Sequence, residues 1–385
     1  MADKAGSIRG EWAQKLLGRI NLALVAMALI VNIGACWKVY RYEPLREAGS
    51  RALMAANSRF IFDSGLAEPA PVAALKAAMA AGADPDAALR VEGLAVFAAV
   101  TWLTLFVLAK RVGRIAGLMG ALFLAANPYM GFYAMQGSSH LYALFPLLLF
   151  WYYLTAPAAS ARSALLAGLF AGLACLSRLD CAFVILLLAG LRLAPRRVPG
   201  GLRSIAIALA LCAALTSPYL AYQGARYGNI FYGQELRLRR WANIDRYGYR
   251  PAGDVPSSPL GTAGFVFRNG PSGALRGLFS GLWRAFAHEL PRALYYKFMM
   301  VLVFLGFYAA AALKKNFLIF FFAAALLPAI PLAPIRQFAA TGGIELRYYL
   351  WALWGMCALA GFGFQETLGW LEKTLGEKYG AAGGA

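Results

Sequence analysis

The sequence has few charged residues, and few of those are acidic. Only 14% of its 385 residues are charged, against roughly a quarter in average soluble chains. Because 61% of the residues are hydrophobic, the composition excludes a soluble globular enzyme, a coiled coil and a disordered chain. The small charged fraction is also lopsided, with 37 Lys and Arg against 18 Asp and Glu, a net charge of +19.

Cysteine and histidine are also scarce. The five cysteines lie in or beside apolar segments without a CxxC spacing, at positions 36, 175, 181, 212 and 357. They are typical of small buried hydrophobic residues and exclude a secreted disulfide scaffold. With two histidines in the chain, His140 and His288, a histidine-rich metal site is not expected. We interpret His140 as a polar residue at a helix end.

Long apolar runs are what the sequence has in abundance. A helix needs about 20 mostly apolar residues to cross a bilayer. Ten runs approach that length, at 18–37, 91–109, 115–133, 138–155, 163–176, 181–194, 202–221, 293–313, 316–334 and 345–364. The fold class predicted from them is all-α integral membrane, with about ten transmembrane helices. The short connection 177–180 predicts a tight hairpin, which an Arg178–Asp180 ion pair could close.

The positions of Lys and Arg orient these spans. Basic residues gather in the N-terminal segment and in alternate connections, at 110–114, 162, 192–203 and 314–315. Short cytoplasmic loops carry such an excess. The pattern therefore predicts a multi-pass protein of the cytoplasmic (inner) membrane with both termini cytoplasmic. Residues 1–364 form a single polytopic domain in this interpretation, and 365–385 form a cytoplasmic tail.

Two predicted extracytoplasmic loops, 38–90 and 222–292, are too long to be simple connectors. In the first, residues 43–60 have the pattern of an amphipathic interfacial helix, with Arg51 away from the apolar stripe. A second helix is predicted from Pro71 to Ala80. Asp84 then resembles an N-cap in front of a proline at the start of the second span.

Both loops contain polar residues that these helices do not explain. Asp63 and Glu68 flank Gly65 in an aromatic-rich turn, and no structural role is evident for either. The second loop is basic and aromatic together, with Arg237, Arg239 and Arg240 beside Trp241. Arginine binds phosphate through two parallel hydrogen bonds, so this loop favours a phosphate-bearing ligand. A cationic face resting on anionic headgroups is the alternative, and nucleic acid is not expected.

Residues 15–222 resemble the GT-C superfamily of polytopic glycosyltransferases, which includes protein O-mannosyltransferases and the lipid A aminoarabinose transferase. The likeness is one of layout. It includes Arg90 near the start of the second span, Asn127-Pro128, the segment GLFAGLACLSRLD and, later, Arg347-Tyr348-Tyr349. The chain departs from the family in two places. No Asp-Glu pair follows the first span, and Gln136, Ser138 and His140 stand where an acidic residue is common.

The resemblance implies transfer of a sugar from a polyprenyl-phosphate-linked donor to a lipid, glycan or protein acceptor on the extracytoplasmic face. A carboxylate of the first loop, Asp63 or Glu43, would act as the base. Cations near the outer helix ends would stabilise the leaving phosphate. The candidate substrate-binding residues are Arg59, Glu68, Arg178, Arg237, Arg239, Arg240, His288, Lys297, Arg347 and Tyr348.

No cofactor is predicted with certainty, no metal ligand is assigned, and a divalent cation is left open. Membrane lipid is the other expected partner, while the sugar, the acceptor and the oligomeric state are not predicted. Two further classes stay open: a transporter or flippase of lipid-linked intermediates, and a non-catalytic assembly partner. A transporter would favour internal repeats and ionisable residues within its spans, and neither is evident here.

Overall fold

The computed structural model describes residues 2–45, 48–65, 68–156, 160–193, 201–247, 259–332 and 346–380. Helix accounts for 84% of the structure, and the described residues contain no strand. The predicted all-α class is therefore confirmed.

The helices follow one another with short connections. The first half comprises α1 (Ala2–Tyr40), α2 (Ala48–Asn57), α3 (Pro69–Ala80), α4 (Pro85–Arg111), α5 (Arg114–Ala125), α6 (Pro128–Met135), α7 (Ser139–Leu154), α8 (Ala161–Ser177), α9 (Cys181–Leu193) and α10 (Gly201–Tyr227). The second comprises α11 (Tyr232–Tyr247), α12 (Thr262–Val266), α13 (Gly270–Arg284), the π-helical η2 (Ala285–Glu289), α14 (Leu290–Leu294), α15 (Met299–Ala312), α16 (Asn316–Leu326), the 3₁₀ turns η3 (Leu327–Ala329) and η4 (Leu346–Tyr349), and α18 (Leu350–Gly380).

Three helices are long and apolar enough to cross a membrane alone, namely α4, α10 and the Arg19–Tyr40 part of α1. Two bent pairs raise this number to five if each pair is one span: α5 with α6, bent by 56°, and Gly270–Leu294 with α15, bent by 115°. Helices α7, α8, α9 and the segment Asn316–Ala329 are apolar but shorter, at 10–17 residues. The structure thus supports a helical membrane protein, and the number of ten spans stays a prediction.

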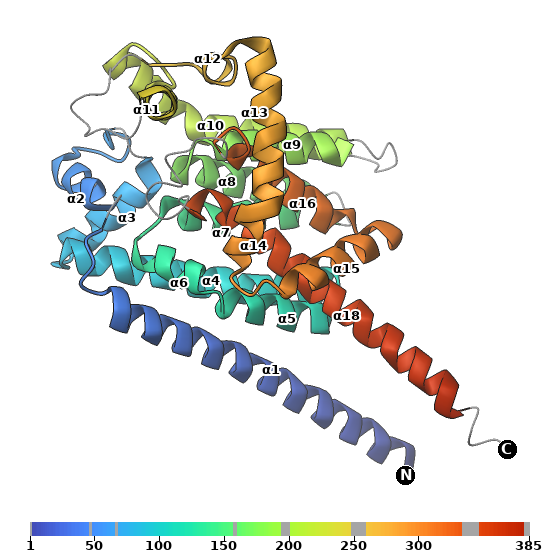
Figure 1. The fold of residues 1–385 in the computed structure, drawn as a ribbon. Helices are drawn as coiled ribbons and strands as arrows, with labels where there is room; N and C mark the ends of the chain where they lie inside the picture. Colours follow the sequence, from blue (N-terminus) through green and yellow to red (C-terminus); the bar gives the residue numbers. More distant parts are fainter. Residues whose placement is uncertain are drawn as a thin grey trace.

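The long helices run side by side. Figure 1 shows the start of α1 and the end of α18 at the same end of the bundle, with α2 and α3 at the opposite end. Helix α18 packs against α5, α15 and α16, while α8 packs against α7 and α10. A Cβ atom on Gly306 would overlap the carbonyl oxygen of Leu359, and one on Gly363 would overlap that of Leu302. Helices α15 and α18 therefore touch backbone to backbone, as small residues permit in membranes.

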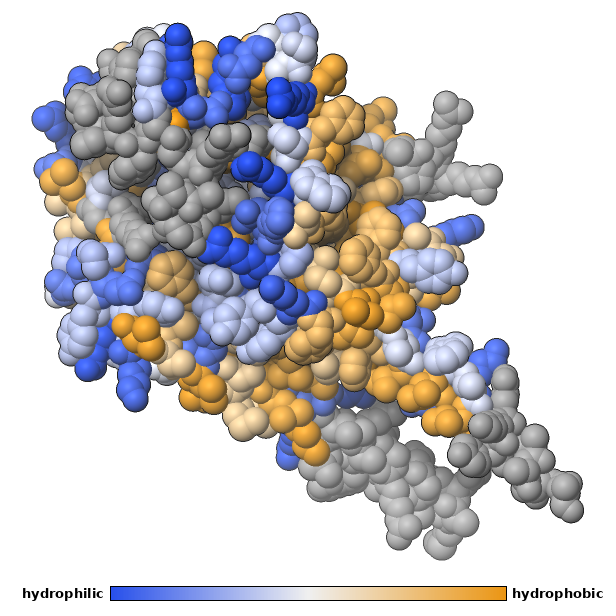
Figure 2. All heavy atoms as spheres, in the orientation of Figure 1, coloured by the Kyte–Doolittle hydropathy of each residue, from blue (hydrophilic) through white to orange (hydrophobic). Residues whose placement is uncertain are grey.

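Buried tryptophans tie α18 to its neighbours. The Nε1 of Trp354 donates to Oγ1 of Thr104 at 2.7 Å, and Nε1 of Trp351 donates to the carbonyl oxygen of His140 at 2.8 Å. Both rings are 1% exposed or less, so satisfying their N–H groups is necessary for stable packing. The second bond also fixes the beginning of α7. Outside the core, Figure 2 shows hydrophobic surface over the middle of the bundle, with hydrophilic residues gathered toward α2, α3 and α11.

The first loop contains the two predicted helices, and the Asp84 cap is confirmed because its carboxylate accepts from the Ala87 amide at 2.9 Å. The orientation predicted for the first helix is wrong. Helix α2 buries Arg51, which is 6% exposed, and leaves Leu53 67% exposed. Arg51 turns inward because its Nη1 donates to the carbonyl oxygen of Gly137 at 2.8 Å, and its guanidinium lies 5.5 Å from the ring centre of Tyr142.

Candidate functional site

Four buried or partly buried charged residues meet at the end of the bundle that carries α2 and α3, which is the predicted extracytoplasmic end. Glu68 precedes α3, Arg178 and Asp180 form the turn between α8 and α9, and Arg237 lies on α11. We call these four residues the ionic cluster. Glu68 and Arg178 are 5% exposed and Asp180 is 8% exposed, although charged side chains are rarely buried unless they are paired.

Arg178 holds the turn between α8 and α9 closed. Its Nε donates to Oδ1 of Asp180 at 2.9 Å, and its Nη2 donates to Oδ2 at 2.7 Å. Its Nη1 donates to Oγ of Ser139 at 2.9 Å, at the start of α7. This planar, two-pronged pairing is the strongest geometry available to an arginine and a carboxylate. The alternative interpretation of Arg178 as an ion-pair residue is therefore correct, and the same pair borders the site.

Glu68 links the first loop to the second. Its Oε1 accepts a hydrogen bond from Nη1 of Arg237 at 2.5 Å, between residues 169 positions apart in the chain. Burial alone would raise the pKa of Glu68, but the charges of Arg237 and Arg178 lower it to about 2. The carboxylate is therefore ionised at neutral pH and serves as an anchor for Arg237.

Tyr348 extends the cluster toward η4. Its ring lies 4.9 Å from the ring of His140 and 5.9 Å from that of Trp241. The guanidinium of Arg347, a residue that is 8% exposed, lies 5.1 Å from the centre of the same ring. Arg178 is near enough for its charge to interact with the Tyr348 hydroxyl. The late Arg-Tyr pair is thus brought to the turn between α8 and α9, although about 170 residues separate them in sequence.

Positive charge exceeds negative charge around this site. Among the described residues, four guanidinium groups and three carboxylates lie close together, those of Arg51, Arg178, Arg237 and Arg347 with Glu68, Glu92 and Asp180. A bound anion would balance the excess in a region where solvent screens little.

Asp63 lies on the same turn as Glu68 but outside the ionic cluster. Its carboxylate accepts from the Tyr222 hydroxyl at 2.5 Å and from the Arg59 amide at 3.1 Å. These two hydrogen bonds lower the pKa of Asp63. The turn is fixed to α10, since Nε2 of Gln223 donates to the carbonyl oxygen of Gly65 at 3.0 Å, and Gly65 has a φ of 65° that favours glycine. Asp63 is half-buried and ionised, so its carboxylate can accept a proton.

The structure brings five of the twelve candidate residues together: Glu68, Arg178, Arg237, Arg347 and Tyr348. Of the others, Glu43 and Arg239 are half-buried, while Arg59, Arg240, His288 and Lys297 are exposed and stand outside the ionic cluster. The half-buried Glu43 sits beyond the end of α1, where its carbonyl oxygen accepts from Nη2 of Arg90 at 2.5 Å. Which first-loop carboxylate is the base therefore stays a prediction.

Sequence reasoning missed Arg51 and underrated His140. Their signals were weak because an arginine on an amphipathic helix and a histidine at a helix end both have ordinary explanations. The loop before α7, with Gln136, Ser138 and His140 in place of an acidic residue, was the available hint. For a metal, no group of three His, Cys, Asp or Glu side chains lies close together in the part of the chain that the structure describes.

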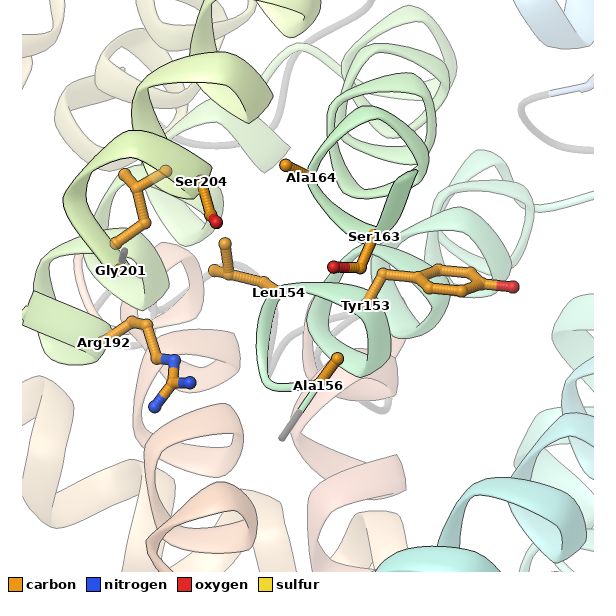
Figure 3. A pocket seen from close by; sticks show the side chains of 9 residues that line it. Tyr153, Leu154, Ala156, Ser163, Ala164, Arg192, Gly201 and Ser204 are labelled. Carbon is orange, nitrogen blue, oxygen red and sulfur yellow. The ribbon is translucent and has the colours of Figure 1, made fainter. Parts of the chain in front are cut away.

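The clearest hollows lie away from the ionic cluster. Figure 3 shows a pocket bordered by Arg192, Ser163 and Ser204, at the opposite ends of α8, α9 and α10. Its volume of about 10 Å³ suits one water molecule. An apolar groove of about 490 Å³ between Leu22 of α1 and 102–110 of α4 also lies toward that end. Neither belongs to the candidate site.

Comparison with known proteins gave no match to a family model and none to a curated protein.

Proposed function

We propose that the chain is a membrane glycosyltransferase of the GT-C type, which uses a polyprenyl-phosphate-linked sugar on the extracytoplasmic face. The observation that carries this proposal is the ionic cluster with its excess of arginine at the predicted outer end of an apolar bundle. A lipid phosphate suits that position because its charge offsets the excess while its chain stays in the membrane. The ten apolar segments would cross the bilayer together, the shorter ones within the packed bundle.

The chemistry assigns separate roles to the two acidic residues of the turn. Asp63, half-buried and ionised, accepts the proton of the acceptor hydroxyl, and Glu43 is the alternative base. The acceptor oxygen bonds to the anomeric carbon as the bond from that carbon to the phosphate oxygen breaks. The leaving phosphate keeps the electron pair, and Arg347 with the neighbouring guanidinium groups stabilises its charge. Glu68 holds Arg237 in place and takes no proton.

The proposal is tested in native membranes that contain the acceptor, by measuring free polyprenyl phosphate released from a polyprenyl-phosphate sugar. Asp63→Asn should reduce the rate about 10²–10⁴-fold, since the base is lost without a change of shape. The matched control is Asp84→Asn, which removes a carboxylate from the same loop but keeps the helix cap. If Asp63→Asn and Glu43→Gln both retain full transfer at normal expression, the transferase mechanism fails.

A flippase of lipid-linked intermediates is the second candidate, because two candidate spans are broken, by 56° and 115°. Interrupted helices are frequent in transporters. The two functions differ in the fate of the sugar–phosphate bond. Vesicles that carry the protein and a labelled polyprenyl-phosphate sugar would show intact lipid moving between leaflets for a flippase, and bond cleavage only with acceptor for a transferase.

A further inference from the structure

Two buried side chains beside the ionic cluster have polar atoms without hydrogen-bond partners. His140 and Ser138 are each 2% exposed. Neither ring nitrogen of His140, nor the hydroxyl of Ser138, has a partner in the described part of the chain. Buried polar groups are nearly always paired in folded proteins, and an unpaired one points to a water or a ligand.

Loose packing does not explain these atoms. The His140 ring lies between Tyr348, at 4.9 Å, and Trp351, at 5.8 Å, and its carbonyl oxygen is bonded to Trp351. Ser139, the residue between the two, accepts from Arg178. Both side chains are therefore held next to the cluster by fixed neighbours.

Ser138 departs from the usual behaviour of its position. It is the N-cap residue of α7, where a serine hydroxyl ordinarily accepts from an amide of the first turn, but its side chain makes no such bond. The first-turn amides and the hydroxyl thus remain available at the same place as the His140 ring. A helix start, an unpaired hydroxyl and an unpaired imidazole converge there.

The chemistry of these groups favours a hydroxyl-bearing ligand over a second anion. A hydroxyl both donates and accepts, so it can pair with either imidazole nitrogen and with a serine hydroxyl. A phosphate oxygen only accepts, and it would leave one nitrogen of a neutral ring unpaired. The nearest cations, Arg178 and Arg237, are already bonded to Asp180 and Glu68. The rings of Tyr348 and Trp241 offer apolar faces against which a sugar ring packs.

We propose that His140 and Ser138 bind hydroxyl groups of the transferred sugar and so determine which sugar the protein accepts. This inference rests on the proposed function, in which the donor phosphate lies at Arg347. Tyr348 contacts both His140 and Arg347, so the sugar and its phosphate would lie on either side of one ring.

The test measures the affinity of the full-length protein in lipid nanodiscs for bare polyprenyl phosphate and for its mannose, glucose and galactose derivatives. For the derivative that wild type prefers, His140→Phe should weaken binding about 10-fold or more, and Ser138→Ala roughly 5-fold. Both variants should bind bare polyprenyl phosphate within about 2-fold of wild type. The matched control is His288→Phe, which changes the exposed histidine outside the cluster. Ser138→Ala keeps the test valid if His140→Phe does not fold.

A deoxy analogue of the preferred sugar sharpens the result. If His140 binds the missing hydroxyl, the analogue and His140→Phe should not weaken binding additively. Unchanged binding of the sugar-bearing lipids by both variants would overturn the inference and leave the proposed function standing. An equal loss for bare and sugar-bearing lipid would also overturn it. Failure of wild type to bind any of the lipids would overturn the proposed function itself.

Discussion

The two ends of the helix bundle treat charge in opposite ways. At the end with α2 and α3, Arg178 and Glu68 are buried and held in ion pairs with Asp180 and Arg237. At the other end Lys110 is exposed, and the half-buried Arg111 donates to the carbonyl oxygens of Thr155 and Tyr152 at 3.0 and 2.6 Å. Carboxylates dominate the contacts of one set of cations, and backbone dipoles those of the other.

This contrast separates the two uses of the net charge of +19. Exposed cations at helix ends orient a membrane protein and need no specific partner. Buried ion pairs are costly to desolvate and seldom raise stability over well-packed apolar residues, so a function is the usual reason to keep them. The contrast therefore locates the functional end of the molecule, and changing single charges at each end tests it.

The largest effect is expected at Arg178. Arg178→Met leaves Asp180 buried without its cation, which should lower the free energy of unfolding by about 3–5 kcal/mol. The measurement is denaturant or thermal unfolding of the purified protein in one detergent. The double change Arg178→Met with Asp180→Leu should restore most of the loss, because no unpaired charge remains. A cost below about 1 kcal/mol for the single change would mean that this end is no more sensitive than an ordinary surface.

A smaller, pH-dependent effect is expected from Glu68. Its pKa is about 2 in the folded protein, against an ordinary value of 4.5. Because the folded value is the lower one, the stabilisation is complete above pH 4.5 and is lost as the pH falls toward 2. The loss should be about 3 kcal/mol, from the difference in pKa. Unfolding measured between pH 5 and 2 should show this slope in wild type and not in Glu68→Gln. Parallel profiles for the two proteins would remove Glu68 from the account.

Much of the fold could be predicted from the sequence because hydrophobic runs, caps and basic loops are local signals. Each apolar run predicted as a span coincides with a helix or with neighbouring helices, and Asp84 caps α4 as expected. The breaks inside the runs were harder to predict. Asn127, for example, caps α6 while its Nδ2 donates to the carbonyl oxygen of Ala293 at 2.9 Å, a contact across 166 residues that no local pattern reveals.

The candidate site was predictable in composition and not in arrangement. Residue type and position in a loop were enough to name Glu68, Arg237 and Arg347. Pairing is decided by tertiary packing, so Glu68 became the partner of Arg237 while Asp63, five residues earlier, bonds to Tyr222. Arg51 was placed on the wrong face because the helical pattern is blind to the buried carbonyl oxygen of Gly137 that attracts it.

The smallest effect is expected at Arg111, at the other end of the bundle. Arg111→Met removes two hydrogen bonds to carbonyl oxygens at the end of α7 and a cation–π contact of 4.7 Å with Tyr152. The carbonyl groups stay close to water, so the free energy of unfolding should fall by only about 0.5–1 kcal/mol. Sugar transfer should not change, since the residue lies far from the ionic cluster. Arg178→Met, measured alongside, provides the contrast on the same change of side chain. If Arg111→Met instead cost as much as Arg178→Met, or abolished transfer, the distinction between an orienting end and a functional end would be wrong, because a cation held by backbone dipoles alone cannot supply such an effect.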